Sequence, residues 1–201
     1  MPILRRGGDG ACFTAIPYGA KDLLAVAGYR TTWGSVPFRD QVIDATAAVV
    51  ERLDAAGAVL VAKTAVGELA WGDVWFDGMC RNPWKLDQGL EPDRRRARHR
   101  SVAAGCVSFR DRHRDLGSIV SPSTRCGVTG LRPTFGRVSR HGAMALSWTM
   151  DKVGPIARTV GDCALAFETI HGAGRARSVL ATASCSRGRR RATSSRSGSA
   201  T

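Results

Sequence analysis

With 201 residues and a formal net charge of +13, the chain is long enough to form one domain with a hydrophobic core. Most of the excess charge lies in residues 90–115, with eight Arg and four acidic residues, and in residues 174–201, with seven Arg and no acidic residue, which argues against an organised nucleic-acid groove. The six cysteines include no C-x-x-C pair, so neither a zinc site nor a disulfide framework is indicated. No apolar run approaches ~18 residues, so no membrane span is indicated. We therefore expect a reduced, cytoplasmic setting.

The first part of the chain predicts short strands, then a helix and a buried strand. Residues 16–35 alternate short apolar pieces with glycines, which is typical of strands and turns. Asp40 is expected to cap a helix that runs to Leu53, because apolar residues recur there at roughly helical spacing. Residues 58–62 are apolar throughout and predict a strand in the interior of an α/β sheet, with Lys63 at its end. Sites in open α/β sheets commonly lie at such strand ends.

The second part predicts one further helix and two segments that do not suit a globular domain. Residues 68–75 predict a short helix or turn, and Thr159 is a good N-cap for a helix that follows it. Residues 90–115 are Arg-rich without a period, and residues 173–201 have the Arg/Ser/Ala composition of a disordered segment. We therefore expect a domain over residues 1–172 with an aberrant segment inside it, followed by a disordered basic tail.

Gly117 and Ser118 lie in a short turn that suits a catalytic nucleophile. A serine that follows a glycine in a tight turn can expose its hydroxyl while nearby backbone N–H groups point at one place, as an oxyanion hole requires. A serine after glycine is, however, most often only a turn residue, and a lysine at a strand end is most often solvated or paired with an acid. Neither residue predicts a function without the sequence around it.

Four blocks of sequence resemble the amidase signature family, whose members are serine hydrolases of C–N bonds. Residues 58–64 (AVLVAKT) resemble the strand that ends in the family's catalytic lysine, and residues 116–119 (LGSI) resemble the turn that carries its nucleophile. Residues 127–158 resemble the stretch downstream of that turn, and residues 16–22 add a weaker match. Four blocks in the family's order are a strong signal, whereas one Gly-Ser-Ile would be a weak one. Since family members are considerably longer, the chain resembles the N-terminal part of one.

The resemblance implies an α/β fold with a mixed sheet flanked by helices, of the amidase signature type and incomplete. It implies that Lys63, neutral through burial, is the base and that Ser118 is the nucleophile that forms an acyl-enzyme. The backbone N–H groups around Asp115, Leu116, Gly117 and Ser118 would form the oxyanion hole. No cofactor and no metal are implied. The substrate would be a small amide, and both a free amidase and the glutaminase subunit of a tRNA-dependent amidotransferase, with its partner subunits, remain open.

The family's third catalytic residue, a bridging serine, has no match in this chain. The family carries it in a Gly-Ser-rich loop soon after Asn-Pro-Trp, but here residues 82–84 (NPW) are soon followed by residues 90–96 (LEPDRRR). Matching blocks on both sides of an alien Arg-rich stretch are what compensating reading-frame slips in GC-rich DNA produce, and the residues after Gly172 fit a further slip. Divergence or an inactive paralogue would also account for them. The second hypothesis is therefore a catalytically dead remnant or a basic binding protein.

Overall fold

A five-stranded mixed sheet forms the centre of the computed structural model, which describes residues 13–72, 74–85, 100–103, 109–113 and 118–172. In spatial order the sheet consists of β2 (Val59–Thr64), β1 (Pro17–Lys21), β5 (Phe109–His113), β7 (Val153–Ala157) and β6 (Thr129–Gly130). β1 runs parallel to β2 on one side and to β5 on the other, whereas β7 runs antiparallel to β5 and to β6. Two further short strands, β3 (Val74–Trp75) and β4 (Gly78–Met79), form a separate antiparallel ribbon.

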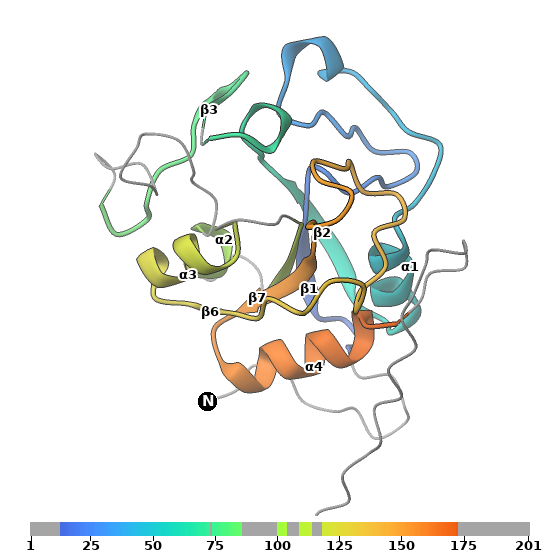
Figure 1. Ribbon diagram of the computed structural model, residues 1–201, viewed down its shortest axis with the longest axis vertical. Coiled ribbons are helices and arrows are strands. Elements are labelled where there is room, and N and C mark those ends of the chain that lie inside the picture. The colour runs from blue at the N-terminus through green and yellow to red at the C-terminus, as the bar shows by residue number, and fades with distance from the viewer. Residues whose placement is uncertain (1–12, 73, 86–99, 104–108, 114–117, 173–201) are drawn as a thin grey trace, which may run out of the picture.

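Helices flank this sheet, as the expected α/β architecture requires. The helices are α1 (Ala48–Ala55), α2 (Arg100–Ala103), α3 (Val120–Cys126) and α4 (Val160–Ile170), with the 3-10 turns η1 (Val36–Phe38) and η2 (Glu68–Ala70). In Figure 1, α4 runs along the lower side of the sheet, α1 lies beside β2, and α3 lies on the opposite side of the view from α1. The predicted fold class, a mixed sheet flanked by helices, is confirmed.

The main hydrophobic core packs α1 and α4 against the sheet. Apolar residues of α1 recur every three or four positions, so they share one face of the helix, and α4 repeats the pattern. Burying such side chains stabilises the fold by about 1.5–3 kcal/mol for each of the larger ones. The core includes Tyr18 and Ala20 of β1, Val49, Val50 and Leu53 of α1, Val153 and Ala157 of β7, and Cys163, Ala166 and Ile170 of α4.

Both ends of α4 are satisfied by side chains. The Thr159 hydroxyl accepts a hydrogen bond from the backbone N–H of Asp162 at 3.1 Å, so the predicted N-cap is confirmed. At the other end, Nη1 of Arg52 lies 2.7, 2.6 and 3.0 Å from the carbonyl oxygens of Ile170, His171 and Gly172. A cation there also complements the helix dipole. Arg52 therefore ties α1 to the end of α4.

The helix predicted from Asp40 begins later than expected, because α1 starts at Ala48. The residues before it bond to the preceding loop instead of to one another. Thr31 and Gln41 share two hydrogen bonds, from the Thr31 N–H to the Gln41 carbonyl at 2.9 Å and from the Gln41 amide to the Thr31 carbonyl at 2.8 Å. The Thr46 hydroxyl accepts from the Ala27 N–H at 3.2 Å. These hydrogen bonds to another part of the same chain take the place of the helical hydrogen bonds that the spacing of the apolar residues predicted.

The strand predicted over residues 58–62 exists as β2, but the expectation that it is wholly buried is wrong. β2 is an end strand of the described sheet, and Val59 and Val61 are 47% and 52% exposed. An apolar run therefore identified a strand without revealing its place in the sheet. The apolar composition that predicts a central strand is here found at an edge.

Part of the Arg-rich segment also belongs to the sheet, contrary to the expectation for residues 90–115. Residues 109–113 (FRDRH) form β5, which is hydrogen-bonded to β1 on one side and to β7 on the other. Backbone pairing on both edges holds this strand in spite of its charged composition. Residues 86–99 and 104–108 lie outside the described residues, as does the predicted tail over residues 173–201.

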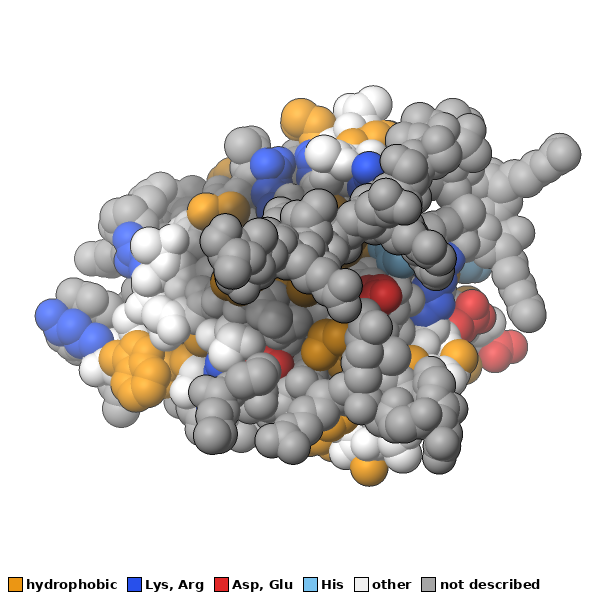
Figure 2. All heavy atoms as spheres, turned by 90° about the horizontal axis from the view of Figure 1, so that it is seen from below, with side chains coloured by type: hydrophobic (Ala, Val, Ile, Leu, Met, Phe, Trp, Pro, Cys, Tyr) orange, Lys and Arg blue, Asp and Glu red, His pale blue; other side chains and the backbone are white. Residues whose placement is uncertain are grey.

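Two observations on the described residues concern the sequence-based expectations about nucleic-acid binding and membrane spanning. On the face drawn in Figure 2, the described Lys and Arg side chains lie in separate places and do not merge into one patch. Across the described ranges, every helix falls short of the length and apolar character that crossing a bilayer would need.

We expect Arg52→Met to lower the free energy of unfolding of the full chain by about 1–3 kcal/mol, because the carbonyls at the end of α4 lose a charged donor. The matched control is Arg30→Met. The Arg30 guanidinium lies 3.3 Å from Asp40 with both side chains largely exposed, and such pairs contribute about 0–1 kcal/mol. Urea unfolding followed by circular dichroism measures both variants. Equal losses would contradict the anchoring role of Arg52.

Candidate functional site

The carboxyl ends of the three parallel strands β1, β2 and β5 lie at one end of the sheet, and Lys63 lies there. Lys63 is the penultimate residue of β2, where it is in register with Ala20 of β1. Ser118 follows β5, whose strand is parallel to β1. Because neighbouring parallel strands end on the same side of a sheet, their following loops converge. The topology therefore predicts that the segment leading to Ser118 begins at the same end of the sheet as Lys63.

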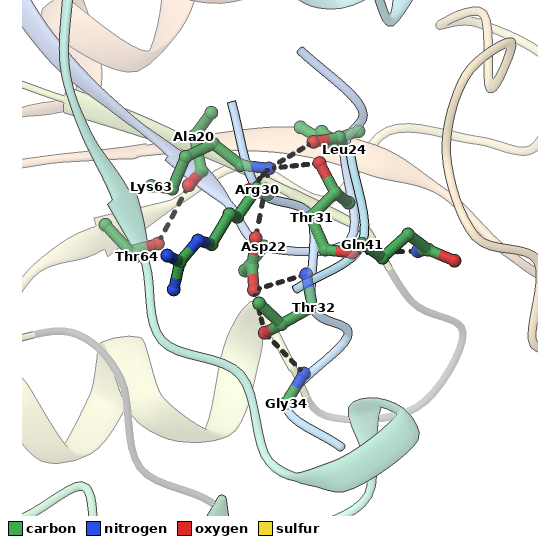
Figure 3. Close-up of polar contacts among 10 residues, drawn as sticks. All are labelled: Ala20, Asp22, Leu24, Arg30, Thr31, Thr32, Gly34, Gln41, Lys63 and Thr64. Carbon is green, nitrogen blue, oxygen red and sulfur yellow. Dashed lines mark hydrogen bonds and ion pairs between the residues drawn. The ribbon is translucent and has the colours of Figure 1, made fainter. Parts of the chain in front are cut away.

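Lys63 is surrounded by oxygen atoms of the loop that follows β1. Its Nζ lies 2.7 Å from the Leu24 carbonyl oxygen, 2.9 Å from the Thr31 hydroxyl and 3.0 Å from Oδ1 of Asp22 (Figure 3). The Arg30 carbonyl oxygen is farther away, at 3.4 Å. The Lys63 and Asp22 side chains are only 13% and 9% exposed, so solvent screens this ion pair weakly.

Asp22 is itself held by the residue next to Thr31. Its second oxygen, Oδ2, accepts hydrogen bonds from the Thr32 backbone N–H, at 3.0 Å, and from the Thr32 hydroxyl. The same hydroxyl oxygen accepts from the Gly34 N–H at 3.2 Å. Thr32 therefore orients the carboxylate so that its first oxygen is left to Lys63, as Figure 3 shows. The result is a continuous polar network from the end of β2 to the 31–34 loop.

A cavity of about 380 Å³ opens beside Lys63. Its walls come from the edge strand β2 and from the loop before Thr31. It is lined by Tyr29, Arg30, Leu60, Val61, Ala62 and Lys63. The volume is in the range of small-molecule sites, which run from about 300 to 1,000 Å³. A small ligand in this cavity would lie against the strand that carries Lys63.

Ser118 is buried and lies just before helix α3. The predicted oxyanion donors and the stretch that would carry a bridging serine lie outside the described residues. Asp115, Leu116 and Gly117, whose backbone N–H groups are the predicted oxyanion donors, lie outside the described residues. So does the 86–99 stretch, where the family carries its bridging serine. The assignments of Lys63 and Ser118 thus stay predictions.

Neither a metal cluster nor a reactive thiol stands out in the described ranges. No group of three or more His, Cys, Asp or Glu side chains there could hold a metal ion. Burial raises the pKa of the Cys163 thiol to about 11, so it stays protonated near neutral pH and is a poor nucleophile. Cys80 and Cys126 are buried and lie outside any disulfide.

Sequence reasoning missed the polar side chains of this network: Asp22 and Thr31, which contact Nζ of Lys63, and Thr32, which donates to Asp22. One signal was present, because Asp22 directly follows an apolar strand and so lies at a strand end, as Lys63 does. Thr31 and Thr32 carry no comparable signal. They belong to a loop whose path back to the strand end depends on its pairing with Gln41.

The sequence profile of a family described as Amidase matches residues 4–89 and 116–197. The unmatched residues between the two stretches are 90–115, the Arg-rich segment. The matched region also extends into residues 173–197, which composition alone had predicted to be a tail.

Several curated and solved proteins are similar to this chain. A glutamyl-tRNA(Gln) amidotransferase subunit of Chromohalobacter salexigens is 40% identical over 171 residues, which cover 84% of this chain and 35% of that protein. The crystal structure of the same kind of subunit from Thermotoga maritima has a TM-score of 0.73 at 32% identity, covering 80% of this chain and 36% of that one. Peptide amidase from Stenotrophomonas maltophilia has a TM-score of 0.71 at 33% identity, covering 80% and 34%. The chain spans about a third of the length of the curated relatives it matches.

We expect Gly34→Ala to destabilise the chain by at least about 1 kcal/mol more than Gly28→Ala. Both glycines have positive φ, +72° and +78°, so both variants carry the backbone strain of a left-handed residue. A Cβ at Gly34 would lie only 2.0 Å from the Val66 carbonyl oxygen, whereas one at Gly28 meets nothing within 4 Å. Thermal and urea unfolding of both variants measure the difference. Equal losses would show that the close packing of these two loops is not what requires glycine.

Proposed function

Because the chain belongs to the amidase family, we propose that it hydrolyses the carbon–nitrogen bond of amides through an acyl-enzyme on Ser118, with Lys63 as the base. Its fold is of the amidase signature type. The observation that supports the proposal is that β2, which carries Lys63, and β5, which Ser118 follows in the sequence, both run parallel to β1. Such an edge can supply a nucleophile and a base from separate strands.

In the proposed reaction, Oγ of Ser118 forms a bond with the amide carbon and loses its proton toward Lys63. The proton then passes to the leaving nitrogen as the C–N bond breaks and the amine or ammonia departs. Water attacks the resulting ester and releases the carboxylic acid and the free Ser118 hydroxyl. The backbone N–H groups of Asp115, Leu116 and Gly117 are the proposed oxyanion donors, each worth about 3–4 kcal/mol in other hydrolases.

The proposed substrate is a small amide, and glutamine is the first candidate. The 40% identical relative is named as part of a glutamyl-tRNA(Gln) amidotransferase, which favours glutamine hydrolysis with ammonia passed to partner subunits. The solved peptide amidase supports the alternative, a free amidase that releases its product. Both activities fit the cytoplasmic setting proposed for this chain.

We expect the chain as it stands to turn over glutamine or a peptide amide more slowly than about 1 s⁻¹, the low end of typical enzymes. The reason is that no serine in residues 90–115 matches the family's bridging serine. Ammonia release measures the rate.

A fluorophosphonate probe, which loses fluoride as its phosphorus bonds to a serine oxygen, should label Ser118. Ser121→Ala is the matched control and should leave labelling intact, whereas Ser118→Ala should abolish it. Labelling that survives Ser118→Ala would overturn the assignment of the nucleophile.

Restoring a relay hydroxyl should restore hydrolysis. We expect a Gly-Ser-Ser-Gly-Gly-Ser-type loop in place of residues 90–99 to raise amide turnover by about 100-fold or more, the usual contribution of positioned proton transfer. The replaced residues end before α2, and β5 is left intact because it lies between β1 and β7.

The control for this experiment is the same loop with each serine replaced by alanine, which separates the hydroxyl from loop flexibility. In the repaired chain, Ser118→Ala and Lys63→Ala should each remove the gain. Their double variant should be little worse than either alone, since nucleophile and base act as a unit. A gain of equal size from the alanine loop would contradict the relay.

A further inference from the structure

Two buried cysteines from separate parts of the chain meet at the end of helix α3. Cys80 and Cys126 are the two buried members of one small hydrophobic cluster. Cys80 directly follows β4, whereas Cys126 is the last residue of α3. The partly buried side chains packed against them are those of Ala65, Trp75, Ala103 and Val128. The fold therefore brings together two thiols whose long separation in the sequence does not mark them as a pair.

Hydrogen bonds hold the segment after Cys80 against the end of α3. The indole N–H of Trp84 donates to the carbonyl oxygen of Cys126 at 3.1 Å. Asn82 closes a tight turn before it, because its side-chain oxygen accepts from the Trp84 backbone N–H at 3.0 Å. Gly127, with φ +63°, ends α3 directly after Cys126 in a left-handed conformation. Both backbones that carry the thiols are thus held in place without a bond between the sulfur atoms.

The two thiols differ in their access to solvent. Cys80 is 9% exposed, whereas Cys126 is only 1% exposed. A small oxidant therefore reaches Cys80 first, and Cys126 lies beside it to react with the product. Redox-active cysteines commonly combine an accessible thiol with a neighbouring resolving thiol. Proximity of the two thiols, and not an unusually reactive single thiol, favours oxidation here.

We propose that Cys80 and Cys126 form a reversible disulfide when the folded chain meets a hydroperoxide such as hydrogen peroxide. The Cys80 thiolate attacks one peroxide oxygen, the O–O bond breaks, and the departing oxygen takes up a proton and leaves as water, so Cys80 becomes a sulfenic acid. The Cys126 thiolate then attacks the Cys80 sulfur, and the S–O bond breaks with release of a second water. Two thiols are oxidised and one peroxide is reduced. The bridge joins the segment after β4 to the end of α3, and it takes no part in the proposed hydrolysis.

Peptide mass spectrometry of the full chain, without reductant, detects the bridge. The folded chain is treated with hydrogen peroxide, and the remaining thiols are then alkylated. We expect the linked peptides that join Cys80 to Cys126 to exceed their yield from the urea-unfolded chain by about tenfold or more, because the fold holds the two thiols together. Dithiothreitol should separate them again. A yield no higher than that of the unfolded chain, or linkage of Cys80 mainly to another cysteine, would overturn the proposal.

Alanine variants separate the roles of the two thiols. Cys126→Ala should leave Cys80 as a sulfenic acid, which dimedone traps, whereas Cys80→Ala should leave Cys126 unmodified under the same conditions. Cys163→Ala is the matched control, because Cys163 is also buried but lies in the main core, so the bridge should form as in the parent chain. Equal dimedone labelling of the remaining thiol in Cys80→Ala and Cys126→Ala would contradict the assigned order of attack.

The parent chain provides a second test if a variant fails to fold. Thiols that survive peroxide are alkylated with light iodoacetamide, and those released by dithiothreitol are alkylated with the heavy reagent. Cys80 and Cys126 should pass from the light to the heavy label in equal proportion as the peroxide concentration rises. Unequal conversion of the two residues would overturn the proposal. Ser118→Ala should leave this readout unchanged, so failure of the proposed hydrolysis and failure of this inference give different results.

Discussion

Parallel pairing of β1 with β2 on one side and β5 on the other is the constraint on which the candidate site depends. It directs the ends of three strands to one edge and places Lys63 in register with Ala20. A slip of one residue between β1 and β2 would turn the Lys63 side chain to the opposite face of the sheet. The core of α1, α4 and β7 holds that register by packing against β1. The site is thus a consequence of sheet topology.

At the carboxyl ends of β1 and β2, apolar packing gives way to a network of hydrogen bonds and one ion pair. Removing two charges from water costs several kcal/mol for each ion, and their attraction offsets this cost only when the remaining donors and acceptors are also paired. Here the second oxygen of Asp22 is bonded by Thr32, and Lys63 has acceptors besides the carboxylate. The network therefore tolerates burial and joins the 22–34 loop firmly to the end of β2.

Local signals in the amino-acid sequence were enough to predict some features of this protein. These are the family, which the blocks around Lys63 and Ser118 indicated, and the start of α4 at Thr159. An N-cap of this kind needs only one hydroxyl and one backbone N–H within a single turn. Other features depend on segments that are distant in the sequence, so only the folded chain reveals them. The late start of α1, the edge position of β2 and the placement of the charged strand β5 all follow from hydrogen bonds to other parts of the chain. The ion pair between Lys63 and Asp22 belongs to this second group, because the parallel pairing of β1 and β2 brings the two residues together.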